Sequence, residues 1–239
     1  MAEAAGRKIL FLETGEYLVM IKNKVILGWL MLAATLISLA LVVIRMTYND
    51  DRTYGFLIWN LVLAWVPYAA AWAATLAERN RTTFLIFMPL CILVWMAFFP
   101  NAPYLLTDFQ HLATANRVTP LWYDVILLIW AAWTGLLLGI ASLKMMQEII
   151  TRAFNPAAGW FFAIGATVLS SMGVYLGRFL RWNSWDLLQD ALPIAKDMYG
   201  IVRHPLSNLP TYVFLILFTL LFLFIYVTIQ LLGRKEENF

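Results

Sequence analysis

The sequence predicts an all-α protein: a polytopic transmembrane bundle of about six spanning helices. Three observations lead to this fold class. Hydrophobic residues make up 62% of the chain and charged residues only 13%, whereas soluble domains are roughly half apolar and about a quarter charged. The mean hydropathy is +0.75. The apolar residues are also grouped in long stretches, so lipid must replace water around much of the folded chain.

Six apolar stretches are long enough, or nearly so, to cross a hydrocarbon core about 30 Å thick as helices. They cover residues 25–45, 55–77, 84–99, 121–143, 157–180 and 209–232. The third stretch is short and contains Pro89. We therefore expect it either to continue past Pro100 or to break there and line the interior of the bundle.

Three regions follow from these stretches. Residues 1–24 are predicted to form an amphipathic segment on the cytoplasmic membrane surface, because residues 7–20 alternate charged and bulky side chains. Residues 25–232 are expected to form a single transmembrane domain, and residues 233–239 a cytoplasmic tail. The N-terminal region has no cleavage site after a short apolar core, which argues against a secretory signal.

Basic residues at the ends of the stretches predict that both termini are cytoplasmic, since Lys and Arg favour that side. In this orientation Lys24 and Arg152 lie on the cytoplasmic side, and Arg45 lies on the outer side. The loop before the last span opposes the trend, because it carries four basic residues: Arg178, Arg181, Lys196 and Arg203.

The charge pattern and the motifs limit the function classes. The net charge is +3, but the basic residues lie at segment ends instead of forming a stripe, so no nucleic-acid partner is expected. The single cysteine, Cys91, excludes an intrachain disulfide and a CxxC metal site. The chain contains no HExxH, GxSxG or Walker A motif, so no motif implies a cofactor.

Polar residues gather in four segments that the proposed orientation places on the outer face. We call this set the polar rim. Its members are Asn60, Pro100, Asn101, Pro103, Tyr104, Asp108, His111, Trp122, Asp124, Arg178, Arg181, Asn183, Trp185 and Asp186. Ionisable groups at the edge of a membrane bundle either pair with one another or mark a functional site.

The rim segment after the third stretch contains two prolines around Asn101. Proline disfavours the α conformation in the residue before it, so Pro100 and Pro103 predict an extended turn. The side chain of Asn101 could satisfy backbone groups that the turn leaves free.

Further along, Tyr104, Asp108 and His111 would share one face of an α-helix. Asp108 and His111 are candidate acid–base groups or weak candidates for a metal site. The alternative is a hydrogen-bonded pair that holds a loop.

Arg178 and Arg181 are three residues apart at the end of the fifth stretch. They could clamp a phosphate or carboxylate, with Asn101, Tyr104 and Asn60 as further binding candidates. Alternatively, the two arginines form a buried network with rim carboxylates. These carboxylates are Asp108, Asp124 and Asp186, of which Asp186 is also a catalytic candidate.

The segment after Arg181 predicts an interfacial helix over residues 184–191. Asn183 would cap it with Asp186 as the acidic partner, and Pro193 would end or kink it. Trp122 and Trp185 suit the aromatic belt at the level of the lipid headgroups.

Two pairs of glycines have the spacing that lets membrane helices approach closely: Gly135 with Gly139, and Gly173 with Gly177. They favour tight packing inside the bundle, and self-association or a partner helix is the alternative. Membrane lipid is the other expected partner.

Three segments carry a resemblance to a known family. FFPNAPYLLTDFQHL, PLWYD followed by AWTGLLLG, and YLGRFLRWNSWD resemble signature segments of the bacterial DUF1361 membrane proteins. The resemblance extends from about Asn60 to the last stretch. It implies a polytopic protein of the bacterial plasma membrane, and it carries over no catalytic residue because the family is defined by an unknown function.

Three functions therefore stay open, and the sequence does not decide whether the protein is an enzyme. The first is a scaffold or assembly factor. The second is a membrane-embedded enzyme or lipid-processing protein that acts on a phosphate-bearing or lipid-linked substrate. The third is a transporter or flippase, although the central parts of the first, fifth and sixth stretches lack the ionisable residues typical of ion paths.

Overall fold

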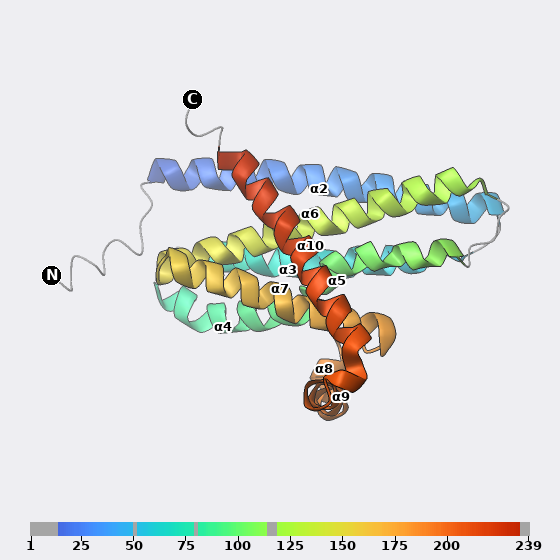
Figure 1. The fold of residues 1–239 in the computed structure, drawn as a ribbon. Coiled ribbons are helices and arrows are strands. Elements are labelled where there is room, and N and C mark those ends of the chain that lie inside the picture. Colours follow the sequence, from blue (N-terminus) through green and yellow to red (C-terminus); the bar gives the residue numbers. More distant parts are fainter. Residues whose placement is uncertain (1–13, 50–51, 79–80, 114–118, 235–239) are drawn as a thin grey trace. The chain divides into compact units, whose positions relative to one another are not determined.

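A computed structural model describes residues 14–49, 52–78, 81–113 and 119–234 (Figure 1). Within these residues the chain is almost entirely helical and has no strand. Six helical stretches are long and apolar enough to cross a membrane, which confirms the predicted fold class. They cover Lys22–Tyr48, Phe56–Ala77, Ile86–Ala113, Leu121–Ala153, Pro156–Phe179 and Leu206–Leu232.

The chain divides into two compact units. Unit 1 covers Met1–Gly159 and contains the first four spans, and unit 2 covers Trp160–Phe239 and contains most of the last two. The expectation of a single transmembrane domain over residues 25–232 stays a prediction.

Unit 1 is a bundle centred on one long helix. Its elements are α2 (Thr14–Asn49), α3 (Phe56–Ala77), α4 (Arg81–Phe98), α5 (Asn101–Tyr104), the 3₁₀ helix η1 (Leu105–Ala113) and α6 (Leu121–Ala153). The helices run side by side in Figure 1, and α6 contacts α2, α3, α5 and η1. Helix α6 therefore supplies one side of many of the contacts in unit 1.

Helix α2 packs along one narrow stripe. Its buried residues recur at alternate spacings of four and three: Met31, Thr35, Ser38, Val42 and Arg45. This spacing keeps one face of a helix toward its neighbours. The other faces expose apolar side chains such as Trp29 and Leu36, as expected for contact with lipid.

The two ends of the chain are described only in part. Helix α2 is continuous from Thr14, so residues 14–24 of the predicted amphipathic segment are helical, and the candidate span begins at Lys22. The place of this segment on the cytoplasmic membrane surface stays a prediction. The rest of that predicted segment, residues 1–13, lies outside the described residues. At the other end, the described chain is helical to Arg234, and residues 235–239 of the predicted tail are not described.

The extended turn predicted at Pro100 is wrong. Pro100 has φ −58° and ψ −27°, and the chain continues in helical form through α5 and η1. Pro100 precedes α5 and Pro103 lies in its first turn, where a helix does not need the N–H group that proline lacks. Asn101 Nδ2 nevertheless donates to the Phe98 carbonyl over 3.0 Å, so its side chain bonds a backbone group at this helix boundary.

Unit 2 consists of two long helices and a helical connection. Its elements are α7 (Pro156–Phe179), α8 (Asp186–Gln189), α9 (Ala191–Arg203), the 3₁₀ helix η2 (Leu206–Asn208) and α10 (Leu209–Arg234). Ser171 and Thr219 join α7 to α10 through a hydroxyl pair of 2.7 Å. Thr211 Oγ1 also donates to the Tyr175 hydroxyl over 2.8 Å. The two spans of unit 2 are thus tied by polar contacts between apolar faces.

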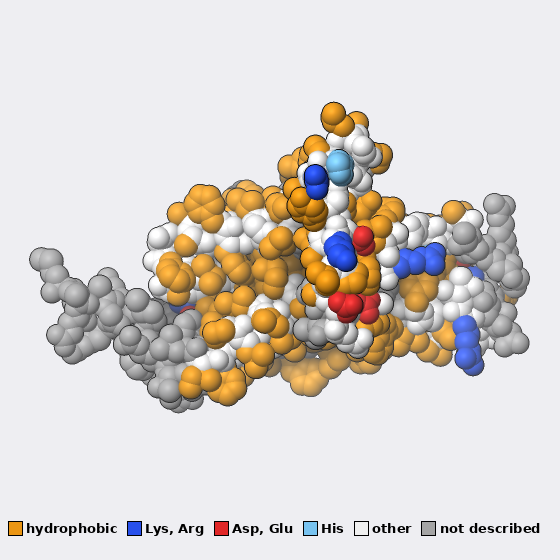
Figure 2. Space-filling view, turned by 90° about the horizontal axis from the view of Figure 1, so that it is seen from below, with side chains coloured by type: hydrophobic (Ala, Val, Ile, Leu, Met, Phe, Trp, Pro, Cys, Tyr) orange, Lys and Arg blue, Asp and Glu red, His pale blue; other side chains and the backbone are white. Residues whose placement is uncertain are grey.

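In place of the predicted interfacial helix over residues 184–191, the chain forms the short helix α8 and then the 13-residue helix α9, which begins at Ala191. Helix α8 ends at Gln189, and the Asp190 carboxylate accepts the Leu192 N–H and caps the longer helix α9. Pro193 lies in the first turn of α9, so it neither ends nor kinks a helix. Figure 2 shows hydrophobic side chains over most of the face drawn, with charged side chains gathered over the α8–α9 segment.

Candidate functional site

Arg45 and Asp124 form a buried ion pair between α2 and α6. Arg45 Nε donates to Asp124 Oδ1 over 2.7 Å, and Arg45 Nη2 donates to Asp124 Oδ2 over 3.3 Å. The two side chains are only 1% and 2% exposed. The guanidinium also lies 5.3 Å from the centre of the Tyr54 ring. A two-pronged pair of this kind offsets part of the large cost of taking both charges out of water.

Asp108 and His111 lie beside the first turns of α3. Asn60 Nδ2 donates to Asp108 Oδ2 over 3.2 Å, and Asp108 is buried. The His111 ring is centred 4.4 Å from the Phe56 ring. Phe56 and Asn60 are one helical turn apart, so the two contacts together dock η1 on the start of α3.

The 3₁₀ form of η1 changes which rim residues share a face. With about three residues per turn, Asp108 lies in one row with Leu105 and His111. Tyr104 falls outside this row, so the predicted common face of Tyr104, Asp108 and His111 is wrong. Tyr104 is half-buried, and its carbonyl accepts the Thr107 hydroxyl over 2.7 Å.

We call these residues the Asp124 end of unit 1: Arg45, Tyr54, Phe56, Asn60, Asp108, His111 and Asp124. Direct contacts connect most of them, and the Tyr54 ring also lies 6.2 Å from the Phe56 ring. Within the described part of the chain, no group of three or more His, Cys, Asp or Glu side chains could hold a metal ion. The contacts observed at the Asp124 end are an ion pair, a hydrogen bond and ring contacts between helices.

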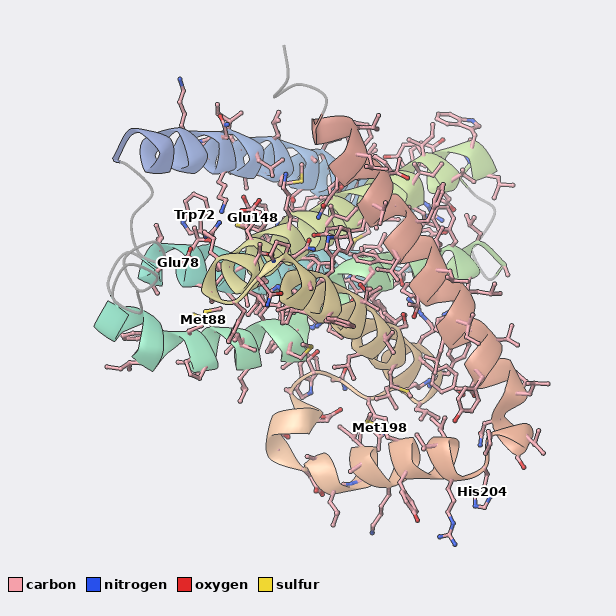
Figure 3. All side chains as sticks on the ribbon, turned by 60° about the vertical axis from the view of Figure 1, so that its left-hand side comes forward. Trp72, Glu78, Met88, Glu148, Met198 and His204 are labelled. Atoms are coloured by element: carbon pink, nitrogen blue, oxygen red, sulfur yellow. The ribbon has the colours of Figure 1, made fainter. Side chains whose placement is uncertain are left out.

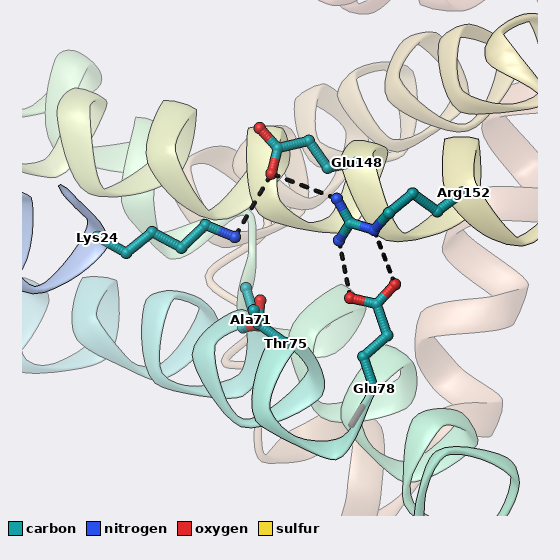
Figure 4. Close-up of polar contacts among 6 residues, drawn as sticks. All are labelled: Lys24, Ala71, Thr75, Glu78, Glu148 and Arg152. Atoms are coloured by element: carbon teal, nitrogen blue, oxygen red, sulfur yellow. Dashed lines mark hydrogen bonds and ion pairs between the residues drawn. The ribbon is translucent and has the colours of Figure 1, made fainter. Parts of the chain in front are cut away.

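A second charged group lies at the opposite end of the bundle, which we call the Glu148 end (Figure 4). Arg152 donates from Nε to Glu78 Oε1 over 2.9 Å and from Nη2 to Glu78 Oε2 over 2.8 Å. Lys24 Nζ lies 3.4 Å from Glu148 Oε2, and Arg152 Nη1 lies 3.9 Å from the same oxygen. These four side chains tie α2, α3 and α6 together.

The two ends lie about one membrane thickness apart. At a rise of about 1.5 Å per residue, Lys24 and Arg45 are separated by about 32 Å along α2. Glu148 and Asp124 are separated by about 36 Å along α6. A hydrocarbon core is about 30 Å thick, so each charged end falls near one membrane surface. Figure 3 labels Glu78 and Glu148 at one of these ends.

The middle of unit 1 contains neutral polar contacts. Ser38 Oγ and Thr134 Oγ1 lie 3.4 Å apart between α2 and α6. Trp65 Nε1 donates to Thr35 Oγ1 over 3.0 Å and connects α3 to α2. These contacts fix the rotation of the three helices about their axes, since each pair requires particular faces to meet.

Gly135 supports a close approach of α5 and η1 to α6. A Cβ at this position would lie 2.7 Å from the Ala102 carbonyl oxygen and would also collide with the Leu105 side chain. This agrees with a packing role inside the bundle for Gly135. Gly139 is buried, and Gly173 and Gly177 are half-buried. A role of any of the four in self-association stays a prediction.

The rim arginines belong to unit 2. Arg178 is half-buried and Arg181 is exposed. Arg181 has φ 62°, a left-handed backbone conformation that residues other than glycine rarely adopt. The next residue, Trp182, donates its N–H to the Leu176 carbonyl over 3.1 Å and its indole N–H to Asp197 over 2.8 Å. The convergence of these arginines with Asp108 and Asp124 in unit 1 stays a prediction.

Asp186 has local partners. Its Oδ2 accepts the backbone N–H of Asn183 over 2.7 Å and the Asn183 side chain over 3.1 Å. The acid therefore reaches back as predicted, but α8 begins only at Asp186, and Asn183 lies before the helix. Trp185 directly precedes α8 and is half-buried, and Trp122 is exposed at the start of α6. Their place in an aromatic belt stays a prediction.

The ion pairs that α2 forms with α6 were not predicted from the sequence. Arg45 and Lys24 were assigned only to membrane topology, yet both pair with α6. A signal was present, because Lys24, Thr35, Ser38 and Arg45 fall on the same four–three stripe. Polar residues that share the buried stripe of a membrane helix are expected to meet polar partners.

The fold and these polar contacts define the class of protein: a multi-pass helical membrane protein whose unit 1 is held at both ends by charged pairs. The chain belongs to the DUF1361 family, described as "Protein of unknown function", whose sequence profile matches residues 59–225. This match confirms the resemblance noted from the sequence. It includes Asp108, Asp124 and Arg178 but not α2. No curated protein and no solved structure matches the chain.

Proposed function

We propose that this protein is a non-catalytic scaffold or assembly factor of the bacterial plasma membrane, with both termini in the cytoplasm. The observation that carries the proposal is that Asp108 and Asp124, the acidic rim residues of unit 1, are buried and hydrogen-bonded to neighbouring helices. Both carboxylate oxygens of Asp124 accept hydrogen bonds from Arg45, and Asp108 is buried against Asn60. A catalytic acid or base needs access to substrate, whereas these groups hold helices together.

The Glu148 end supports the same role. Ion pairs at both ends tie α2 to α6, and hydroxyl contacts lie between them. Such a frame keeps the exposed apolar face of α2 in a constant position, for example Trp29 and Leu36. In lipid, helices associate through packing of such preformed surfaces.

The test is the composition of the native complex. The tagged protein is expressed from its own locus and extracted in polymer-bounded membrane patches, and its mass is measured by native mass spectrometry. We expect one partner protein at a constant ratio. An isolated monomer that carries only lipid would contradict the proposal.

Matched variants connect that test to the ion pair. Arg45→Asp alone should break the complex, because it places two carboxylates together. The exchange Arg45→Asp with Asp124→Arg should restore the complex, since it restores the pair. Asp108→Asn should leave the complex intact, whereas a catalytic role for Asp108 would require the carboxylate.

A second candidate is the binding of a phosphate-bearing or lipid-linked substrate, and one observation favours it. Arg181 is exposed in a backbone conformation that glycine would adopt more easily, and conformations of this kind cluster at ligand sites. Arg181→Gly removes the guanidinium while relieving the backbone. Pyrophosphate binding is measured by calorimetry. Loss of binding in an Arg181→Gly protein that is as stable as the parent would support a phosphate-binding function. A parent protein that binds no pyrophosphate would contradict this function. The transporter hypothesis receives no comparable support.

A further inference from the structure

Helix α9 is held within unit 2 by contacts on one side. Ile194 and Ile201, two turns apart, are buried. Tyr212 donates its hydroxyl to the Ile201 carbonyl over 3.2 Å, which ties α9 to α10. Asp197 accepts the Trp182 indole over 2.8 Å, which ties α9 to the segment after α7.

A second face of α9 is apolar and exposed. Leu192, Ala195, Tyr199 and Val202 are spaced by three, four and three residues, so they form one stripe along the helix. Leu192, Tyr199 and Val202 are each more than 60% exposed, at 64%, 62% and 63%. Three large apolar side chains in one stripe are unfavourable in water, so this face needs a nonpolar neighbour.

A basic edge borders the apolar stripe. At about 100° per residue, Lys196 and Arg203 lie within about 60° of Tyr199 around the helix. Arg203 Nη1 lies 3.4 Å from the Tyr199 hydroxyl, and its guanidinium lies 5.7 Å from the centre of the Tyr199 ring. Tyr199 therefore positions Arg203 at the boundary between apolar and polar surface.

The acidic residues Asp190 and Asp197 have hydrogen-bond partners of their own. Asp190 caps the N-terminus of α9, and Asp197 lies with the Trp182 indole away from the basic edge. The side of α9 that carries the apolar stripe is thus bordered by positive charge alone. An apolar stripe with Lys and Arg along its border is typical of helices that lie in a membrane surface and bind anionic lipid.

We propose that α9 lies in the membrane interface and recognises an anionic lipid surface. Leu192, Tyr199 and Val202 enter the boundary of the acyl chains, and Lys196 and Arg203 contact headgroup phosphates. Figure 3 marks the course of α9 with Met198 and its C-terminal end with His204. The inference goes beyond the scaffold role, because it assigns a lipid partner to unit 2 and does not depend on a partner protein.

The first measurement is the depth of α9 in the full chain, reconstituted in nanodiscs of phosphatidylcholine with phosphatidylglycerol. In a Cys91→Ala background, Val202→Cys and Lys196→Cys each carry a spin label. We expect the label at position 202 to be accessible to oxygen, and the label at position 196 to be accessible to a water-soluble nickel chelate. If the label at position 202 is relaxed mainly by the nickel chelate, this side chain faces water. If neither oxygen nor the chelate relaxes the label, it is covered by protein. Either result would overturn the proposal.

The second measurement counts phosphatidylglycerol molecules that stay bound during native mass spectrometry. The double variant Lys196→Gln/Arg203→Gln should retain less phosphatidylglycerol, by about fivefold for each basic residue removed. The matched control removes two exposed basic residues of unit 1 by Arg52→Gln with Lys144→Gln, and should retain the lipid. The conservative exchange Lys196→Arg with Arg203→Lys should also retain it. Equal retention in the neutralised variant and in the control would exclude recognition by α9.

Discussion

At the scale of single residues, we expect the largest loss of stability when one partner of the Arg45–Asp124 pair is removed. Asp124→Ala leaves a guanidinium buried without its counter-charge. Removing one partner of a buried pair typically costs about 3–5 kcal/mol. We expect a loss of this size in the free energy of unfolding, measured by titrating dodecyl sulfate into mild-detergent micelles.

The control removes both charges at once. Arg45→Met with Asp124→Leu replaces the pair by apolar side chains, which are often neutral or stabilising at buried sites. We therefore expect the double variant to regain most of the stability that Asp124→Ala loses. A double variant as unstable as the single one would mean that the pair itself contributes a large net stabilisation.

Gly135 gives a second prediction at this scale. Gly135→Ala should destabilise the protein by about 1–3 kcal/mol, because the new methyl group meets the Ala102 carbonyl and the Leu105 side chain. Gly165→Ala is the matched control, since a Cβ there has no neighbour within 4 Å. Thermal unfolding in detergent compares the two variants. Equal losses of stability would show that helix α5 can move away from α6.

At the scale of elements, the boundary between α8 and α9 depends on one side chain. The Asp190 carboxylate accepts the Leu192 N–H over 3.3 Å. Asp190→Ala should cost about 1 kcal/mol of helix stability. Faster hydrogen exchange over the first turn of α9 would reveal this loss. Asp190→Asn keeps a capping oxygen and should exchange like the parent; equal exchange in all three proteins would mean that the cap is dispensable.

Elements were predicted well where length and hydropathy suffice, and poorly where proline decides the path. All six spans were found, and each observed span overlaps its predicted stretch. The path after Phe98 was missed, because a proline can end a helix or lie in the first turn of the next one. Proline disfavours the α conformation in the residue before it, but this preference alone does not decide between the two cases. Here the segment packs against α6 and stays helical.

At the scale of the whole molecule, the two charged ends of unit 1 predict its position in the membrane. With both termini cytoplasmic, Arg52 at the Asp124 end faces outward and Ala157 at the start of α7 faces inward. In a Cys91→Ala background, Arg52→Cys should react with an impermeant thiol reagent on intact cells. Ala157→Cys should react only after lysis. The reverse pattern would invert the proposed orientation.

The sequence by itself determined that this protein is a multi-pass helical membrane protein, where its spans lie, and which positions carry costly polar groups. These properties follow from composition and local hydropathy, because a spanning helix satisfies its own backbone and needs only length and apolar side chains. Only the tertiary structure decided the partners of the polar groups. Arg45 meets Asp124 across 79 residues of sequence, and Asn60 meets Asp108 across 48. Such pairs depend on the rotation and relative depth of neighbouring helices, which are set by packing between them. The stripe of polar residues on α2 indicates that partners exist, but it does not indicate which residues they are.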